Sequence, residues 1–247
     1  HVDELSPEMI KVRDYVPEYA VIAHRGSTFW TPEETESAYR WAREIGADYL
    51  ECDMQVSKDG VVLALHDDNL KRTTNIETVF GETLPREIRK NYYMKIGYSE
   101  TEAEEKVKAD EVNFVPNLPA YYTYEELLML DAGSWFNNEN LEEALPGLAK
   151  EKQYISTLED LIMYSKGYRL IRDRNQPGMP RQYSIVGKTG ETITSLSGTA
   201  DIVKYDFGYE IDPVWEAGNK NIPGIYIEFK EPWLNPKGFE QIVYDVL

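Results

Sequence analysis

The sequence predicts an α/β fold built on a sheet that is buried on both faces. Residues 19–66 follow the order strand, helix, strand, turn, strand, which is typical of α/β proteins. The strand segments are apolar without alternation, as expected where both faces of a parallel sheet are covered. A run of the same kind, IYIEFK at 225–230, returns near the end of the chain.

Composition excludes several classes of protein. The single cysteine among 247 residues rules out a disulfide framework, and 42% hydrophobic with 28% charged residues is typical of a globular chain. No apolar run approaches the ~20 residues of a transmembrane helix. The net charge of −18 argues against the basic surface that nucleic-acid-binding proteins present. We therefore expect no nucleic-acid partner, no transmembrane segment and, for an anionic substrate, a locally positive site.

The first strand and helix are predicted from residues 19–46. The run YAVIA at 19–23 predicts a buried strand that ends in His24, Arg25 and a glycine. The segment TPEETESAYRWAREIGA then predicts a helix that ends near Gly46. Thr31 is the expected N-cap, with proline at the first helical position and Glu34 closing a capping box. Apolar residues at helical spacing give this helix one packed face: Ala38, Trp41, Ala42 and Ile45.

Two further strands follow at 48–54 and 61–66. DYLECDM is strand-like, SKDG at 57–60 marks a tight turn, and VVLALH is an apolar strand that ends on His66. Cys52 points to the apolar side of its strand, so we interpret it as core packing.

The pattern loosens between residues 67 and 222. Helices are expected at 125–130 and at 156–166, the second capped by Ser156 or Thr157. Short strands separated by glycine-containing turns are expected between 168 and 207, as a hairpin-rich excursion. A last helix begins in KGFEQIVYDVL at the end of the chain.

Two histidines away from the terminus, His24 and His66, each follow an apolar strand at its carboxyl end. In parallel α/β folds this edge is where ligands bind. One histidine in such a place is more often a structural residue, but two at equivalent places favour a functional site.

Glu51 and Asp53 are two residues apart on one strand, so both point to the same face. Two buried carboxylates side by side repel each other unless a cation lies between them. Their hard oxygen atoms suit Mg²⁺ or Ca²⁺. The alternative is a solvent-exposed strand end.

Glu228 and Lys230 repeat this geometry in IYIEFK. They supply either a third carboxylate for a metal and an ammonium group for an anion, or an internal ion pair. Arg25 would clamp a phosphate or bind a carboxylate of the site. The helix dipole and the capping box are enough to explain Glu33 and Glu34 in a first helical turn.

The order of these segments resembles the glycerophosphodiester phosphodiesterase family. The resemblance is carried by AHRG, by PEET at the start of a helix, and by GADYLECDMQVSKDGVVLALHDDNLKRTT. LDAGSWF at 130–136, ISTLEDLI at 155–162 and the Glu-x-Lys of IYIEFK resemble its later landmarks. The match covers most of residues 19–74 and patches thereafter.

This resemblance implies a (β/α)₈ TIM-type barrel, a divalent metal (Ca²⁺ or Mg²⁺), and hydrolysis of glycerophosphodiesters to sn-glycerol 3-phosphate and an alcohol. Position by position, it implies metal ligands at Glu51, Asp53 and Glu228. It implies a general acid/base pair at His24 and His66, and phosphate contacts at Arg25 and Lys230. Glu33 matches an acid near the metal. Glu34 stands where the family usually has asparagine, which puts a hydrogen-bonding role there in doubt.

Two departures from the family concern the whole chain. The connection from His66 to Glu228 is much longer than usual, so 67–222 is interpreted as a long insertion between the third and fourth barrel strands of a domain covering 1–247. Only about four barrel strands are evident by residue 230, whereas a barrel has eight. We therefore expect this chain to be part of a longer polypeptide, incomplete at its C-terminal side.

Different functions remain open within and outside catalysis. The substrate is a small phosphodiester, but a lysophospholipid or another head group is open, with the insertion shaping the leaving-group pocket. A catalytically silent binding module on the same barrel is the possibility of a different class. A secreted, periplasmic or envelope-associated location is favoured over a cytoplasmic one, and the oligomeric state stays open.

Overall fold

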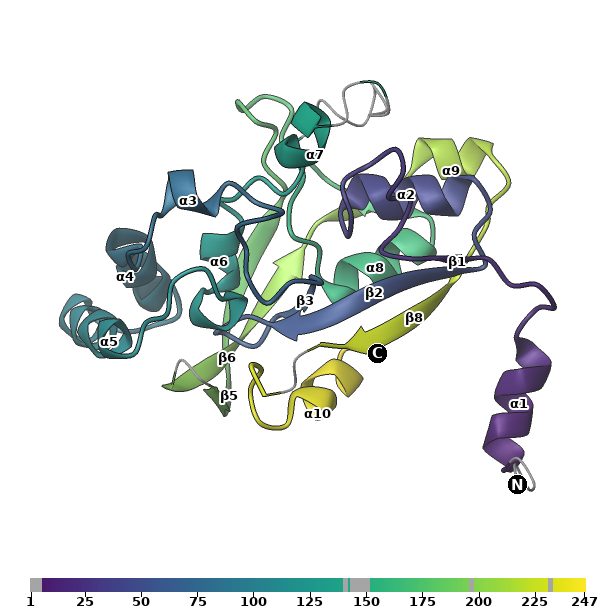
Figure 1. Ribbon diagram of the computed structural model, residues 1–247. Helices are drawn as coiled ribbons and strands as arrows, with labels where there is room; N and C mark the ends of the chain where they lie inside the picture. Colours follow the sequence, from purple (N-terminus) through teal and green to yellow (C-terminus); the bar gives the residue numbers. More distant parts are fainter. Residues whose placement is uncertain (1–5, 140–141, 143–151, 196–197, 231–232) are drawn as a thin grey trace.

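A mixed four-stranded sheet lies at the centre of the protein (Figure 1). The computed structural model describes residues 6–139, 142, 152–195, 198–230 and 233–247. Strands β1 and β8 both pair with β2 in parallel, whereas β3 pairs with it antiparallel. The strands of this sheet are β1 (Ile22–Ala23), β2 (Tyr49–Val56), β3 (Val62–Ala64) and β8 (Gly224–Phe229).

The antiparallel direction of β3 corrects the expectation of a wholly parallel sheet. Only a short turn separates β2 from β3, with Val56 opposite Val62, and a parallel return would need a crossover of roughly a dozen residues. The chain therefore folds straight back. The Leu65 N–H donates to the Asp53 carbonyl at 2.8 Å, which returns His66 to the level of the β2 carboxylates.

The strand expected at 19–23 is shorter and more exposed than its sequence indicates. Only Ile22 and Ala23 form β1, and the side chains of Val21 and Ile22 are 59% and 45% exposed. Within the described residues β1 pairs only with β2, and the four strands do not close into a barrel.

Helices α2 (Glu36–Glu44) and α8 (Leu158–Ser165) cover one face of the sheet (Figure 1). Leu50, Cys52 and Met54 on β2 point into this core and are fully buried, as predicted for Cys52. Burial of a side chain such as Leu50 contributes about 1.5–3 kcal/mol. The polar side chains of β2 therefore point to the opposite face of the sheet.

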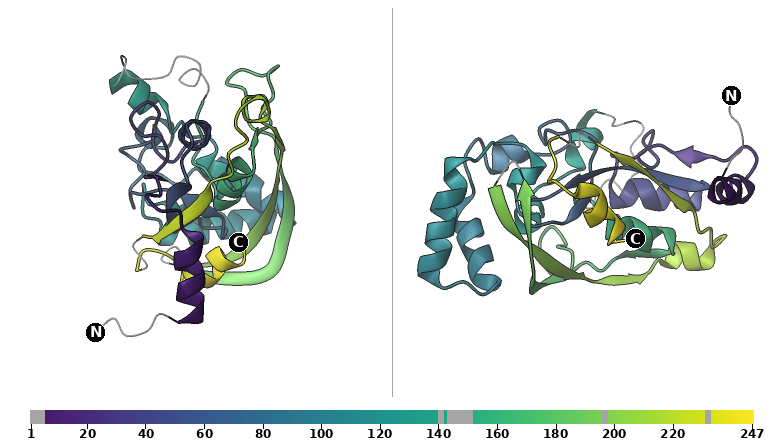
Figure 2. Two further views of the ribbon diagram at one scale, coloured as in Figure 1. Left: turned by 90° about the vertical axis from the view of Figure 1, so that its right-hand side faces the viewer. Right: turned by 90° about the horizontal axis from the view of Figure 1, so that it is seen from below.

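The remaining helices lie around this centre, and α1 projects away from it (Figure 1). Sequence periodicity did not predict α4 and α5, which are rich in charged residues and lie together at one end of the molecule (Figure 2). The helices not yet given are α1 (Pro7–Tyr15), α3 (Ile76–Val79), α4 (Arg86–Lys95), α5 (Glu100–Val112), η1 (Pro119–Tyr121), α6 (Tyr124–Leu127), α7 (Ser134–Glu139), α9 (Pro213–Ala217) and α10 (Phe239–Tyr244). No helix described here is both long enough and apolar enough to cross a bilayer.

The strand-rich segment forms two antiparallel pairs. Strand β4 (Tyr168–Leu170) pairs with β7 (Tyr209–Ile211), and β5 (Tyr183–Ser195) pairs with β6 (Gly198–Phe207). Two short strands expected within 182–196 are thus one long strand, although residues 196 and 197 lie outside the described part. The β5–β6 ribbon curves along one side of the molecule (Figure 2).

Helix α2 starts later than predicted. Its N-cap is Thr35, whose side chain accepts from the Ala38 N–H, and not Thr31. Glu34 has a left-handed φ of 55°, which a helical residue does not adopt, so it closes no capping box. The turn that contains Glu34 is instead shaped by the contacts of the candidate site.

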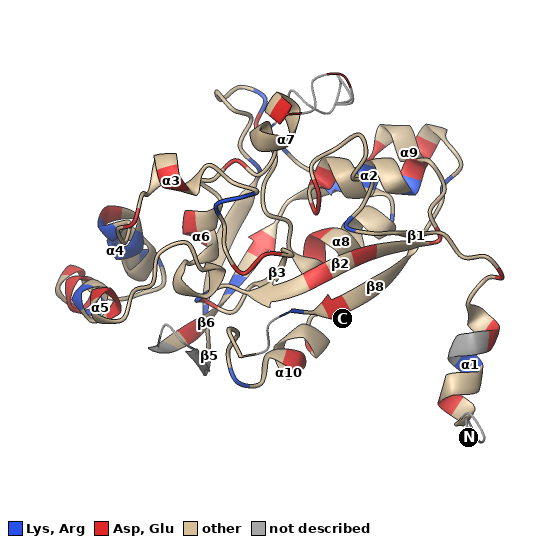
Figure 3. Ribbon diagram, viewed as in Figure 1, with Lys and Arg blue, Asp and Glu red and all other residues tan. Residues whose placement is uncertain are grey.

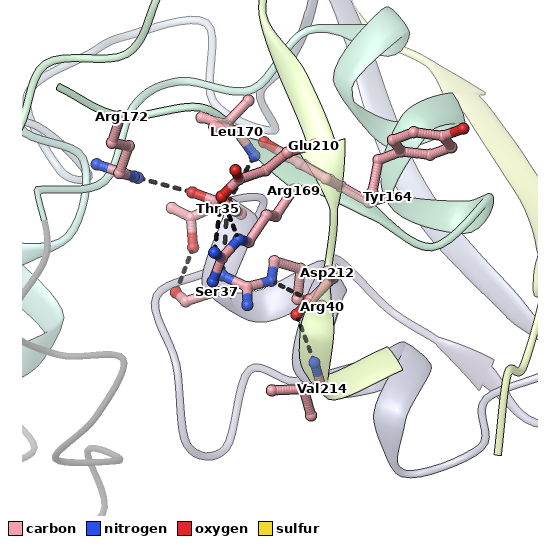
Figure 4. Close-up of polar contacts among 12 residues, drawn as sticks. Thr35, Ser37, Arg40, Tyr164, Arg169, Leu170, Arg172, Glu210, Asp212 and Val214 are labelled. Atoms are coloured by element: carbon pink, nitrogen blue, oxygen red, sulfur yellow. Dashed lines mark hydrogen bonds and ion pairs between the residues drawn. The ribbon is translucent and has the colours of Figure 1, made fainter. Parts of the chain in front are cut away.

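A buried ion-pair cluster fixes the far side of α2 against β4 and β7 (Figure 4). Arg40 Nε and Arg43 Nη2 each lie 2.6 Å from Asp212 Oδ2. Glu36 accepts from Arg172 Nη2 at 2.7 Å and from the Leu170 N–H at 3.1 Å. The helix that follows the site loop is therefore held by charged contacts as well as by its apolar face.

Candidate active site

Three predicted carboxylates meet on neighbouring strands. Glu51 and Asp53 lie on β2, and β8 places Glu228 directly opposite Asp53 in the parallel register. One ligand atom from each of the three lies within 4.8 Å of the others. Glu51 and Asp53 are buried, whereas Glu228 is exposed. Figure 3 shows the acidic colour on both β2 and β8.

The buried oxygen atoms of this cluster fit a divalent cation. The buried Glu51 Oε1 accepts no hydrogen bond from the described residues, and the two buried Asp53 oxygen atoms have only ion-pair contacts, each at 3.2 Å, with Lys230 and Arg25. Burial raises the pKa of Glu51, and the charges of Asp53 and Glu228 act in the same direction. Buried carboxylate oxygens with spare lone pairs are the ligands that Ca²⁺ and Mg²⁺ take, so the donor set matches the predicted metal.

Lys230 places its ammonium group between two of these carboxylates. Its Nζ lies 3.2 Å from Asp53 Oδ1 and donates to Glu228 Oε1. That hydrogen bond is the largest cause of the lowered pKa of Glu228. Burial lowers the pKa of Lys230, but its bonds to Glu228 and Asp53 outweigh this and raise it. Lys230 is therefore a cation at the site.

Arg25 binds carboxylates of the cluster through both its backbone and its side chain. Its N–H donates to Glu51 Oε2 at 2.7 Å, and its Nε lies 3.2 Å from Asp53 Oδ2. Its Nη1 lies 3.3 Å from Glu33 Oε1. Of the two roles left open for Arg25, the structure shows the carboxylate contact, and the phosphate contact stays a prediction.

The loop between β1 and α2 is built from residues in unusual backbone conformations. Arg25 and Glu34 both have left-handed φ values, 56° and 55°, and the Glu34 N–H donates to the Arg25 carbonyl at 2.9 Å. Such strain in non-glycine residues collects at functional sites. Glu34 Oε1 accepts from the Asp53 N–H at 2.8 Å, so this position keeps a hydrogen-bonding role despite the departure from asparagine. Burial raises the pKa of Glu34 well above its usual value.

Both predicted histidines lie at the same edge as the carboxylates. His24 is exposed on the loop after β1. Its charge lowers the pKa of Glu51, an effect smaller than those of burial, the Arg25 N–H and the charge of Asp53. His66 is half-buried, and its charge contributes to the lowered pKa of Glu228. Each imidazole is therefore within electrostatic reach of the cluster.

Sequence reasoning missed several polar residues around His66. Gln55, on the carboxylate face of β2, donates from Nε2 to the carbonyls of Leu65 at 3.0 Å and Asp67 at 2.6 Å. Asp67 Oδ1 lies 2.7 Å from His66 Nδ1. The His-Asp dipeptide after a strand could have indicated Asp67, but no local pattern indicated Gln55.

Comparison with known proteins gives a consistent set of relatives. Residues 24–182, more than half of the chain, match the Glycerophosphoryl diester phosphodiesterase family. A mouse protein named glycerophosphoinositol inositolphosphodiesterase GDPD2 is 29% identical over 202 residues, covering 78% of this chain and 32% of the relative. A glycerophosphodiester phosphodiesterase of Bacillus subtilis is 29% identical over 141 residues, covering 57% of this chain and 34% of the relative.

A solved structure shows a partial likeness. It is a phosphodiesterase from Oleispira antarctica in complex with the product sn-glycerol-3-phosphate, with 26% identity and a TM-score of 0.38. The likeness covers 63% of this chain and 44% of that one. The chain spans about a third of the length of the mouse and Bacillus relatives, and the family match ends before Glu228 and Lys230.

Proposed function

This chain belongs to the Glycerophosphoryl diester phosphodiesterase family, whose fold is a TIM barrel, and on that premise we propose that it hydrolyses glycerophosphodiesters to sn-glycerol 3-phosphate and an alcohol. The observation that carries the proposal is the convergence of Glu51, Asp53 and Glu228, with ligand atoms within 4.8 Å, at an edge that also holds two imidazoles and two cations.

The substrate's negative charge is met by placed cations in an otherwise acidic protein. Lys230 and Arg25 lie beside the carboxylates and their side chains are 19% and 18% exposed, which supports a contact of each with a phosphodiester oxygen. Hydrogen-bond donors and charges fixed before reaction stabilise the charge that grows on the phosphorus oxygens in the transition state.

Glu51, Asp53 and Glu228 would hold Ca²⁺ or Mg²⁺, since all three offer hard oxygen ligands. When bound, such an ion neutralises the diester and polarises its phosphorus–oxygen bonds. The buried Oε1 of Glu51 supports this assignment because no described donor satisfies it, and Asp53 keeps spare lone pairs beside its ion pairs with Arg25 and Lys230.

His24 and His66 then serve as the general acid/base pair. One imidazole takes the proton of the glycerol 2-hydroxyl, whose oxygen forms a bond to phosphorus as the bond to the alcohol oxygen breaks. The other imidazole gives its proton to that leaving oxygen. Water subsequently opens the cyclic phosphate to sn-glycerol 3-phosphate, with the two histidines in reversed roles.

A second bond specificity is suggested by the name of the mouse relative, an inositolphosphodiesterase. An enzyme of that kind releases inositol phosphate and glycerol in place of glycerol phosphate and inositol. Two further functions are compatible with the same fold: hydrolysis of a lysophospholipid, and binding without catalysis.

Product analysis tests the proposal. The protein is incubated with Ca²⁺ or Mg²⁺ and with glycerophosphocholine, glycerophosphoinositol or a lysophospholipid, and the products are identified by mass spectrometry. We expect sn-glycerol 3-phosphate from the glycerophosphodiesters. Inositol phosphate with free glycerol would reassign the bond that is cleaved, and no product from any diester would favour a catalytically silent binding module.

A further inference from the structure

A chain of alternating charges runs beside His66 and leads through Glu33 to the proposed site residues Arg25 and Asp53. Arg72 Nε and Nη2 donate to the two oxygen atoms of Asp67 at 2.6 and 2.9 Å. The same guanidinium donates from Nη1 and Nη2 to both oxygen atoms of Glu33, at 3.0 and 2.7 Å. Glu33 in turn pairs with Arg25, which pairs with Asp53.

We propose that Asp67 is a positioning residue for His66, and that Arg72 fixes Asp67 by tying it to the Glu33 carboxylate of the loop before α2. The consequence for turnover rests on the proposed function, in which His66 is an acid or base. The geometric part of the proposal concerns the imidazole alone and does not depend on the proposed function.

The position of Asp67 determines which ring nitrogen of His66 is free. A carboxylate accepts and does not donate, so the 2.7 Å contact to Nδ1 holds the proton on Nδ1 in the neutral ring. Nε2 is then the nitrogen with a free lone pair. Gln55 fixes the backbone on either side of the ring, at the Leu65 and Asp67 carbonyls. These backbone contacts leave the orientation and the tautomer of the imidazole undetermined, and Asp67 therefore controls both.

Arg72 makes this arrangement rigid although it is partly exposed. Its hydrogen bond is the largest cause of the lowered pKa of Asp67, about 2, so the carboxylate stays ionised in any ordinary buffer. A guanidinium can bind two carboxylates in forked geometry, which an ammonium group cannot. Arg72 also lies over the ring of Trp135, 5.8 Å from its centroid. The link joins the chain after β3 to the loop after β1, the two segments that carry the histidines.

The tautomer of His66 is a direct readout. We would record ¹⁵N imidazole shifts above the titration of the ring for the wild-type protein, D67N and D68N, with H66A assigning the signal. Asp68 is the matched control because it adjoins Asp67 and makes no hydrogen bond or ion pair within the described residues. We expect the Nδ1–H tautomer in wild type and D68N and a shift toward Nε2–H in D67N. An Nε2–H tautomer in wild type, or no change in D67N, would overturn the proposal.

A double-mutant cycle then tests the link to turnover. We expect D67N to lower kcat by about 10- to 100-fold with little change in KM, and R72K to cause a smaller loss in the same parameter. In the H66A background D67N should have no further effect, because its action passes through the imidazole. An equal loss in that background would assign Asp67 a different role. If the wild-type protein cleaves no diester, the proposed function fails while the tautomer measurement still decides the positioning role.

Discussion

Asp53 shows how single residues carry several tasks in this site. Its carboxylate is fully buried between Arg25 and Lys230, its N–H is held by Glu34, and its strand register brings Glu228 opposite. Alternation along β2 predicted that Glu51 and Asp53 share a face, because the period of a strand is fixed by its geometry. Binding of a site carboxylate was one of two roles expected for Arg25, and sequence could not decide between them because the contact depends on a left-handed residue in a loop.

His66 is the residue whose loss should affect chemistry most directly. Replacing it with alanine (H66A) removes one member of the proposed acid/base pair, so kcat should fall by at least ~10²-fold. The ring is half-buried and bonds only to Asp67 among the described residues, so folding should be retained. Steady-state kinetics together with thermal unfolding checks both statements. Near-normal turnover would remove His66 from the mechanism.

Glu228 is the exposed member of the carboxylate cluster and the easiest to change without disturbing the core. E228Q lowers the charge available to a cation, so the affinity for Ca²⁺ or Mg²⁺ should fall about 10- to 100-fold by isothermal titration calorimetry. Glu240, in the first turn of α10, supplies the matched control E240Q. Equal affinities for E228Q and wild type would show that the cation is held elsewhere.

At the scale of elements, the loop between β1 and α2 depends on close approach at Gly26. This glycine has φ 86°, and a Cβ there would lie 2.7 Å from Ala38 Cβ and 2.8 Å from its backbone carbon. G26A should therefore cost the left-handed penalty of about 1–2 kcal/mol and a further overpacking cost of about 1–3 kcal/mol.

Gly46 provides the control for that prediction. Its φ is 92°, but a Cβ would meet nothing within 4 Å, so G46A should show only the backbone penalty. Urea unfolding of both variants separates the two effects. Equal losses of stability would contradict the close packing of the site loop on α2.

The attachment of α2 to Asp212, the N-cap of α9 directly after β7, gives a pH-dependent prediction. Burial opposes ionisation of Asp212, but the hydrogen bond and charge of Arg40, together with Arg43, outweigh it and lower the pKa. A carboxyl group with a lowered folded-state pKa stabilises the protein above its unfolded pKa of about 3.9, and this stability is lost as the pH falls below that value.

D212N should therefore be destabilised by about 3 kcal/mol at pH 7, because it leaves Arg40 and Arg43 without that charge. The difference from wild type should stay constant down to about pH 5 and shrink below about pH 4. Urea unfolding across this range measures it, and the other acids cancel in the difference. A gap that persists unchanged at pH 3 would contradict the assigned ion pairs.

Sequence patterns predicted elements where local physics is strong and failed where tertiary contacts decide. Thr157 caps α8 as one of two predicted caps, and the turn before β3 was recognised from its glycine. The predicted start of α2 was wrong because Glu34 accepts a hydrogen bond from the Asp53 N–H, which is 19 residues away in sequence. Helices α4 and α5 were missed because they bury few apolar residues; Arg89, for example, is buried through ion pairs with Asp110 and Glu126.

At the scale of the whole molecule, the resemblance predicted the family and its fold class, and the comparisons confirm the family. The parallel direction expected for β3 was wrong. This strand is antiparallel, and the other three central strands are parallel to one another. Long-range pairing explains the difference: β8 joins β2 across most of the chain, and no local pattern specifies its neighbour. The Glu-x-Lys motif alone indicated that these distant segments share one site.

We propose that this edge of the sheet cleaves phosphodiesters with the help of a bound cation. The most direct test is release of glycerol 3-phosphate from glycerophosphocholine, followed by a coupled assay before and after a chelator, and again after Ca²⁺ or Mg²⁺ is restored. We predict release that the chelator abolishes and the metal restores. Undiminished release in the chelator would show that the cleavage needs no bound cation.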